Sequence, residues 1–338
     1  MSEPIQHRPV EAGSKPAAEE PLHPLPPTPV SPRPHRNSDL PARLLTAAIL
    51  VPAVLYVVAT GGLLYLFTVM AIVVLGQREF YGLIEHKGAR PEVRFGLAAG
   101  AALPVIAYLG NEYHTTLLMT ATLLATLVLQ LRKARIHQAL ASVSGTFFGV
   151  FYVGWLLSHA VVLRFFSEAA AKRFGFSSET LAAATGLVPD AGIFFMVYTL
   201  TVVVFCDAGA YFAGRAFGRR KLAPTVSPGK TVEGAIGGLV AGVAGGLLCK
   251  LVFQLAWPTL SRGLDWTAVA LFGIVLSIFG ILGDLIESLL KRDAERKDAG
   301  WLLPGMGGVL DRIDSPLLAI PVMYYMLSFY FFLQVGPR

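Results

Sequence analysis

From Arg43 onward the sequence is dominated by apolar runs that are long enough to cross a lipid bilayer. A transmembrane α-helix needs about 20 mostly apolar residues, and a chain with 54% hydrophobic and 15% charged residues has more apolar side chains than a soluble domain normally carries. The runs cover residues 43–60, 62–77, 95–110, 115–131, 143–163, 191–213, 234–257, 266–290 and 316–334. They predict an all-α, polytopic integral membrane protein with about nine transmembrane helices.

Basic residues divide unevenly between the two sides that these nine helices define. With the N-terminus inside, the cytoplasmic segments and their flanking ends hold 22 of the 28 Lys and Arg residues. Cytoplasmic loops of membrane proteins are enriched in Lys and Arg, so the count predicts a cytoplasmic N-terminus and a C-terminus on the opposite side. The same bias explains the net charge of +6. Because the sequence carries no nucleic-acid-binding module, we expect no nucleic-acid partner.

Proline content separates the N-terminus from the rest of the chain. Residues 1–41 contain 11 of the 22 prolines, which predicts a disordered, Pro-rich cytoplasmic tail. Residues 42–190 are expected to form the N-terminal transmembrane helices. Residues 191–338 carry the two charged motifs described next, and we expect them to form a C-terminal transmembrane catalytic region.

Residues 283–314 are a polar island in this apolar chain, with seven of its 22 acidic and five of its 28 basic residues. Asp284 and Glu287 lie three positions apart, as do Asp311 and Asp314, so each pair would share one face of a helix. Such a face can hold a hard cation. Groups suited to phosphate lie between the pairs: Lys291, Arg292, Lys297 and a turn with Gly305, Gly307 and Gly308. This combination is typical of Mg²⁺-assisted phosphoryl chemistry.

A plainer interpretation is that the island is only a hydrated cytoplasmic loop. Asp284, however, follows the apolar run 271–282. An ionisable residue in or near the bilayer is costly unless it has a function, and this favours the functional interpretation.

A second motif occupies residues 205–238. Asp207 lies in an apolar run, where it is either a functional carboxylate or one paired with a basic residue of another helix. The segment from Ser227 to Thr231 precedes a predicted helix and offers a hydroxyl, the Lys230 ammonium and free N–H groups, which can cradle a triphosphate. The spacing of a Walker A loop is absent. The glycines that follow at every fourth position, from Gly234 to Gly246, predict close helix packing.

Both motifs resemble those of the phosphatidate cytidylyltransferases, which make CDP-diacylglycerol from CTP and phosphatidic acid. The matching positions in the second motif are Asp207, Gly209, Ala210, Tyr211, Ser227, Pro228, Lys230, Thr231, Glu233 and Gly234. Those in the island are Ser288, Lys291, Arg292, Lys297, Asp298, Pro304, Gly307, Gly308, Asp311, Arg312 and Asp314. The chain departs from the family at Ala208, Gly229 and Met306, where a hydroxyl residue, a lysine and a histidine are usual.

The resemblance implies transfer of CMP from CTP to phosphatidic acid, with one or two Mg²⁺ ions and an undetermined role for a monovalent cation. Asp284, Asp311 and Asp314, with Asp207 or Glu287, are the implied metal ligands. The implied CTP and phosphate contacts are Ser227, Lys230, Thr231, Glu233, Gly307, Gly308, Lys291, Arg292 and Arg312. Lys297 and Asp298 would shape the loop or face the nucleotide. The expected location is a bacterial plasma membrane, with the active site facing the cytoplasm and with possible homodimers.

Three other functions stay open at this point. An ion-coupled transporter would use Asp207, Asp284 and Glu287 to carry cations. A CTP-dependent polyprenol or phytol kinase would transfer the γ-phosphate. An inactive paralogue would explain the three departures from the family pattern.

Overall fold

The computed structural model describes residues 39–110, 112–132, 138–302 and 307–335. The chain divides into two units, Met1–Asn37 and Ser38–Arg338. The predicted tail, residues 1–41, lies almost entirely outside the described residues, and the description below concerns the second unit.

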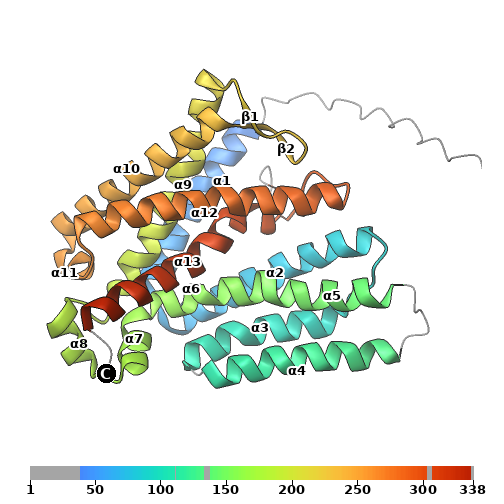
Figure 1. The fold of residues 1–338 in the computed structure, drawn as a ribbon, viewed down its shortest axis with the longest axis horizontal. Coiled ribbons are helices and arrows are strands. Elements are labelled where there is room, and N and C mark those ends of the chain that lie inside the picture. The colour runs from blue at the N-terminus through green and yellow to red at the C-terminus, as the bar shows by residue number, and fades with distance from the viewer. Residues whose placement is uncertain (1–38, 111, 133–137, 303–306, 336–338) are drawn as a thin grey trace, which may run out of the picture. The chain divides into compact units, whose positions relative to one another are not determined.

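Helices dominate the second unit (Figure 1). The N-terminal helices are α1 (Asp39–Thr60), α2 (Gly62–His86), α3 (Val93–Leu109), α4 (Glu112–Leu131), α5 (Ala139–Gly149), the π-helix η1 (Val150–Trp155), α6 (Leu156–Arg164), α7 (Phe166–Phe174) and α8 (Ser178–Thr185). They are followed by α9 (Ala191–Phe217), the strands β1 (Lys221–Ala223) and β2 (Ser227–Thr231), α10 (Val232–Ala256), α11 (Pro258–Ser261), α12 (Trp266–Asp293) and α13 (Leu310–Val335).

All nine predicted segments are helical, and the protein is an all-α polytopic membrane protein. Seven helical segments among the described residues are long and apolar enough to cross a membrane, with α5, η1 and α6 forming one continuous segment. The described part of α1 and helix α3 are apolar but shorter. The count of nine and the side of the N-terminus stay predictions. One element was not expected: β1 and β2 pair antiparallel and form a hairpin between α9 and α10.

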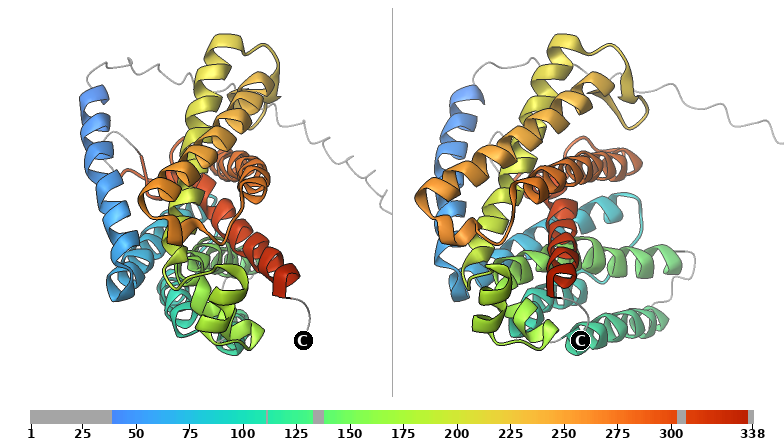
Figure 2. Two further views of the ribbon diagram at one scale, coloured as in Figure 1. Left: turned by 90° about the vertical axis from the view of Figure 1, so that its left-hand side faces the viewer. Right: turned by 60° about the vertical axis from the view of Figure 1, so that its left-hand side comes forward.

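The predicted glycine packing is confirmed, because α9 and α10 lie side by side along the glycine-rich face of α10 (Figure 2). A Cβ added at Gly234 would lie 2.9 Å from the carbonyl oxygen of Ala210. One added at Gly238 would lie 2.8 Å from the carbonyl oxygen of Cys206. Only glycine allows the two backbones to approach this closely. The hairpin therefore joins two helices that are held in close contact at the end next to it.

Helices α12 and α13 meet at a similarly close crossing. A Cβ added at Gly283 would meet the carbonyl oxygen of Asp314 and lie 3.2 Å from the Cα atom of Ser315. All of these contacts are with backbone atoms, so no side-chain rotation can relieve them. This crossing brings the C-terminal half of α12 against the first turns of α13, where the polar island begins and ends.

Arg164 anchors the N-terminal helices to one another. Its buried guanidinium donates to the carbonyl oxygens of Val58 (2.6 Å) and Ala59 (3.3 Å) and pairs with Asp190 (3.3 Å). The last carbonyl groups of a helix have no partners within it, so Arg164 satisfies the end of α1. This basic residue has a structural role.

Candidate active site

The charged motifs converge on one cavity of about 730 Å³. Its walls come from the second half of α9, the β1–β2 hairpin, the start of α10, the C-terminal part of α12 and the first turns of α13. The polar residues that line it are Asp207, Tyr211, Arg215, Ser227, Lys230, Thr231, Asp284, Lys291, Asp298, Asp311, Arg312 and Asp314. The motifs at 205–238 and 283–314 thus form one site, as a shared function requires.

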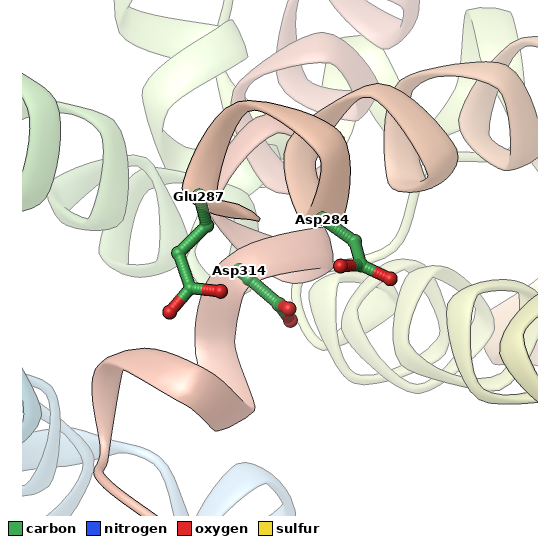
Figure 3. Close-up of side chains that lie close together, drawn as sticks. All are labelled: Asp284, Glu287 and Asp314. Atoms are coloured by element: carbon green, nitrogen blue, oxygen red, sulfur yellow. The ribbon is translucent and has the colours of Figure 1, made fainter. Parts of the chain in front are cut away.

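Three carboxylates form a compact cluster at this site (Figure 3). Asp284 and Glu287 project from neighbouring turns of α12, and Asp314 of α13 lies between them. One oxygen atom from each residue lies within 4.8 Å of one from each of the others. We call these three residues the carboxylate triad. The crossing at Gly283 creates the triad, because it holds the backbone of Asp314 against α12.

The triad fits a hard divalent cation. The Glu287 side chain is fully buried, and neither of its carboxylate oxygens is in hydrogen-bond geometry with any described donor, although the Lys291 ammonium lies 2.6 Å from Oε2. The ion pair with Lys291 compensates only part of the cost of burying this carboxylate, because Oε1 has no partner among the described residues. Three carboxylates at this spacing offer the oxygen ligands that Mg²⁺ and Ca²⁺ prefer, so a bound cation would offset the cost of burying Glu287.

Asp207 and Lys230 extend the triad toward α9 and the hairpin. The Lys230 ammonium lies 2.6 Å from Oδ2 of Asp284, and both side chains are partly exposed in the cavity. Asp207 interacts electrostatically with Asp284, Asp314 and Lys230, but it is not part of the compact cluster. Of the five predicted metal ligands, three therefore cluster, and Asp207 stands beside them.

Asp311, the fifth predicted ligand, lines the cavity but is bound by the protein itself. Its carboxylate pairs with the Lys291 ammonium at 2.7 Å. It also accepts hydrogen bonds from the backbone N–H groups of Gly308 (2.8 Å) and Ala299 (3.1 Å). These contacts tie the loop between α12 and α13 to the start of α13. The structure thus places Asp311 where it fixes this loop, outside the carboxylate triad.

The hairpin presents the predicted triphosphate contacts. Ser227, Lys230 and Thr231 line the cavity. Thr231 also caps α10, because its hydroxyl accepts a hydrogen bond from the N–H of Gly234 at 3.1 Å. The carboxylate of Glu233 accepts from the backbone N–H groups of Arg219 (3.0 Å) and Arg220 (3.1 Å), so it holds the base of the hairpin.

Several predicted contacts lie away from the described cavity lining. The side chain of Arg292 reaches the carbonyl oxygen of Val226 (3.4 Å), and that of Lys297 is exposed. The N–H of Gly308 donates to Asp311 and not into the cavity. Gly307 has a φ of 85°, which suits glycine. The described residues that line the cavity do not include Arg292, Lys297, Gly307, Gly308 or Glu233. Pro304, Gly305 and Met306 lie outside the described residues.

The departure at Gly229 leaves space in the cavity wall. A Cβ added there would meet nothing within 4 Å among the described residues. A Cβ atom at this position therefore fits without rearrangement. Arg215, which the sequence analysis did not single out, lines the same cavity, and its guanidinium donates to the Tyr211 hydroxyl at 3.2 Å. Asp207, Tyr211 and Arg215 follow one another at four-residue spacing along α9, and this helical periodicity was the signal that could have found Arg215.

Glu79 of α2 is a second residue that sequence analysis missed. Its Oε2 atom accepts a hydrogen bond from the N–H of Leu310, the first residue of α13, at 2.8 Å. A Cβ added at Gly300 or Gly308 would collide with the same carboxylate. Glu79 therefore caps α13 and packs against both ends of the loop that Asp311 closes. Nothing in the sequence links Glu79 to this loop, because the two bonded residues are 231 positions apart.

Replacing Glu79 with Ala is expected to lower turnover about 10- to 100-fold, because it removes a group that positions the loop. Glu79→Gln keeps an oxygen that can accept from Leu310 and should retain most of the activity. The measurement is kcat and KM for both variants in purified form, with Glu85→Ala on the same helix as the control. If Glu79→Ala and the control Glu85→Ala both keep the wild-type kcat, Glu79 has no positioning role.

The comparisons with known proteins agree on one family. The family model described as "Cytidylyltransferase family" matches residues 41–330. A protein of Synechocystis named phosphatidate cytidylyltransferase is 31% identical over 301 residues, which cover 84% of this chain and 95% of the relative. A Brucella suis protein of the same name is 35% identical over 291 residues, which cover 85% of this chain and 93% of the relative.

A third relative matches a shorter part of the chain. The Bacillus subtilis protein named phosphatidate cytidylyltransferase is 43% identical over 139 residues, which cover 41% of this chain and 49% of the relative. This match spans about half the length of that relative. Together with the family model and the two longer matches, it leads to one conclusion: this chain belongs to the cytidylyltransferase family.

Proposed function

We propose that this protein transfers CMP from CTP to phosphatidic acid, which yields CDP-diacylglycerol and pyrophosphate. The observation that carries the proposal is that Asp284 and Asp314 of the carboxylate triad line the same cavity as Lys230, Thr231 and Ser227 of the hairpin. Carboxylates for a divalent cation and phosphate-directed donors in one site are the equipment for phosphoryl transfer. The names of the relatives supply the substrates, CTP and phosphatidic acid.

The reaction needs little acid–base chemistry from the protein. An oxygen of the phosphatidate phosphate attacks the α-phosphorus of CTP, a new P–O–P bond forms, and the bond to the β-phosphate oxygen breaks as pyrophosphate leaves. A phosphate monoester has a second pKa of about 6, so the nucleophile is largely ionised near pH 7. The protein has to bring two polyanions together and to stabilise the charge on pyrophosphate.

In this proposal the triad, with Asp207 beside it, holds one or two Mg²⁺ ions. When bound, Mg²⁺ neutralises phosphate oxygens and orients them for in-line displacement. The ammonium of Lys230 stands next to Asp284 at the cavity wall and contacts the triphosphate, with the hydroxyls of Ser227 and Thr231. Arg312 and Arg215 line the same cavity and face the lipid phosphate or the nucleotide. Lys291 supports the site through its ion pairs with Glu287 and Asp311.

The side of the membrane and the membrane in which the site lies are also part of this proposal. The distribution of Lys and Arg supports a cavity on the cytoplasmic side, where CTP is available, and the bacterial relatives support a plasma membrane as the location. A role for a monovalent cation and a homodimer stay predictions.

The proposed function is tested with CTP labelled at either the α- or the γ-phosphate. The purified protein in detergent receives phosphatidic acid, Mg²⁺ and one of the two labelled nucleotides, and the lipid fraction is analysed. Label entering the lipid only from the α-position supports CMP transfer. Label entering from the γ-position would identify a kinase, and no transfer by folded protein would support an inactive paralogue.

Lys230 offers a specific prediction for nucleotide binding. Lys230→Ala is expected to reduce kcat/KM for CTP about 10- to 100-fold, because a hydrogen bond to a charged group contributes about 1.5–3 kcal/mol. Lys221→Ala is the matched control, since Lys221 is an exposed lysine of β1, on the same hairpin, and is not among the described residues that line the cavity. The measurement is steady-state kinetics at varied CTP. Equal losses in the two variants would show that the hairpin charge acts only at long range.

A further inference from the structure

Tyr152 is a tyrosine of the π-helix η1, and only 4% of it is exposed. Its ring stacks on that of Phe148, with centroids 5.3 Å apart, and packs against that of Phe80 in α2, with centroids 5.9 Å apart. Its buried hydroxyl has no hydrogen-bond partner among the described residues. A tyrosine hydroxyl usually finds a partner when it is buried, so the position of this one needs an explanation.

The π-helix that carries Tyr152 approaches α13 next to the carboxylate triad. A Cβ added at Gly76 of α2 would lie 3.2 Å from Cδ1 of Ile313 and 3.5 Å from Cγ1 of Val153. Ile313 directly precedes Asp314 in the sequence, and Val153 directly follows Tyr152. One point on α2 therefore contacts both the neighbour of the triad and the neighbour of the tyrosine.

Two members of the triad surround the tyrosine hydroxyl with negative charge. Glu287 and Asp314 both interact electrostatically with Tyr152. Glu287 is fully buried, and it is not among the described residues that line the cavity, whereas Asp284 and Asp314 are. Tyr152 is also not among them. The hydroxyl and Glu287 thus belong to the buried side of the triad.

The buried side of the triad holds an unpaired donor and an unpaired acceptor. The ammonium of Lys291 lies 2.6 Å from Oε2 of Glu287, which leaves Oε1 without a partner among the described residues. The Tyr152 hydroxyl can donate one hydrogen bond, and a carboxylate can only accept. Because buried polar groups are rarely left unpaired, the two groups are complementary.

We infer that Tyr152 is a positioning residue of the triad, and that its hydroxyl donates a hydrogen bond to the Glu287 carboxylate when the triad holds a divalent cation. Residues that bond to the ligands of a metal fix the orientation of these ligands and raise metal affinity. Hydrogen bonds of an active site are often long or poorly aligned until the site is loaded. The π-helix agrees with this role, since single π-turns within longer helices are frequent at functional sites.

The inference rests on the part of the proposed function that assigns a cation to the triad, and it is independent of CMP transfer. Tyr152 acts through Glu287 and has no contact with a substrate in this scheme. The quantity that it sets is the affinity of the triad for the cation. This affinity is measured without CTP and without lipid.

Tyr152→Phe tests the inference, because it removes the hydroxyl and keeps the ring. The purified protein in detergent is titrated with Mn²⁺, and the free Mn²⁺ is measured by electron paramagnetic resonance. We expect about tenfold weaker Mn²⁺ binding, at the lower end of the range of about 10- to 100-fold for loss of such a partner. In EDTA the thermal unfolding midpoint of the variant should equal or exceed that of the wild type, since an unpaired buried hydroxyl is costly.

Tyr65→Phe is the matched control. Tyr65 is also 4% exposed, but its hydroxyl donates to the carbonyl oxygen of Ala160 at 3.0 Å and so links α2 to α6. Loss of this bond should lower the unfolding midpoint in EDTA and leave the Mn²⁺ affinity unchanged. The two variants are therefore expected to show opposite patterns, which a general loosening of the fold would not produce.

Asp314→Asn separates a failure of this inference from a failure of the cation site. If Mn²⁺ binds to the wild type and not to Asp314→Asn, while Tyr152→Phe binds as tightly as the wild type, Tyr152 has no positioning role and the cation site stands. If Asp314→Asn binds as tightly as the wild type, or the wild type does not bind, the cation assignment fails and the inference fails with it. Weaker binding by Tyr152→Phe together with a lower midpoint in EDTA would show a packing role and would also overturn the inference.

Discussion

Replacing Asp314 with Asn is expected to reduce CMP transfer on the order of 10³-fold, the upper range for loss of one electrostatic contact that stabilises a transition state. The amide keeps the size of the side chain, and its oxygen can still accept the 2.8 Å hydrogen bond from the N–H of Ser315. What it loses is the negative charge between Asp284 and Glu287. The defect should therefore appear in the dependence of the rate on Mg²⁺ concentration, with a normal thermal unfolding midpoint.

Asp293→Asn is the matched control for this prediction. Asp293 is a half-exposed aspartate at the C-terminal end of α12 that pairs with Lys87 at 2.5 Å, away from the cavity lining. Its substitution should leave activity within about twofold, because exposed ion pairs contribute about 0–1 kcal/mol. If Asp314→Asn also stays within that range, the triad does not hold a catalytic cation.

Asp311→Asn distinguishes the two roles that we assign to carboxylates in this site, which are cation binding and fixation of the loop. Turnover should be abolished or nearly so, because the amide loses its ion pair with Lys291 and cannot hold the loop in the same way. Since Asp311 is outside the triad, the Mg²⁺ concentration that gives half-maximal residual activity should change less than in Asp314→Asn. Normal activity in Asp311→Asn would exclude both metal binding and loop fixation by this residue.

Replacing Gly283 with Ala is expected to reduce activity on the order of 10²-fold, the effect that a displacement of about 1 Å can have on an active site. The new Cβ would meet the carbonyl oxygen of Asp314 and lie 3.2 Å from its carbonyl carbon. Since backbone atoms cannot rotate away, α13 has to move from α12, and Asp314 moves with it. Overpacking of this kind also destabilises the fold by about 1–3 kcal/mol.

Gly280→Ala provides the control one turn earlier on α12. The Cβ added there would lie 3.7 Å from Cγ2 of Val203 and 3.9 Å from Cβ of Ser315, which are ordinary contacts. Activity and thermal midpoint should stay near wild type for Gly280→Ala and fall for Gly283→Ala. Similar values for the two variants would mean that the crossing does not set the geometry of the triad.

The helices and the carboxylate pair on α12 could be predicted because they depend on local spacing. Apolar runs of spanning length locate the helices, and three-residue spacing places Asp284 and Glu287 on one face. The same rule put Asp311 and Asp314 together, but only Asp314 joins the triad. The difference arises from the crossing at Gly283 and from the contacts that Asp311 makes with Lys291 and the loop, and both are tertiary contacts.

Two other features could not be predicted from local sequence patterns. The β1–β2 hairpin was not expected, because its strands are only three and five residues long and lack an alternating apolar pattern. Glu79 gave no signal at all, since its partner Leu310 is distant in the sequence. A carboxylate near the end of an apolar run looks like any cytoplasmic boundary residue until the fold brings its partner to it.

The contact between Glu79 and Leu310 sets an order of events in biosynthesis. Chains emerge from the ribosome N-terminus first, so α2 enters the membrane long before α13 exists. The loop after α12 can close only when α13 arrives and its first N–H group reaches Glu79. The same step delivers Asp314 to Asp284 and Glu287. The nascent chain therefore passes through insertion without a complete carboxylate triad, which forms only in the final step of assembly.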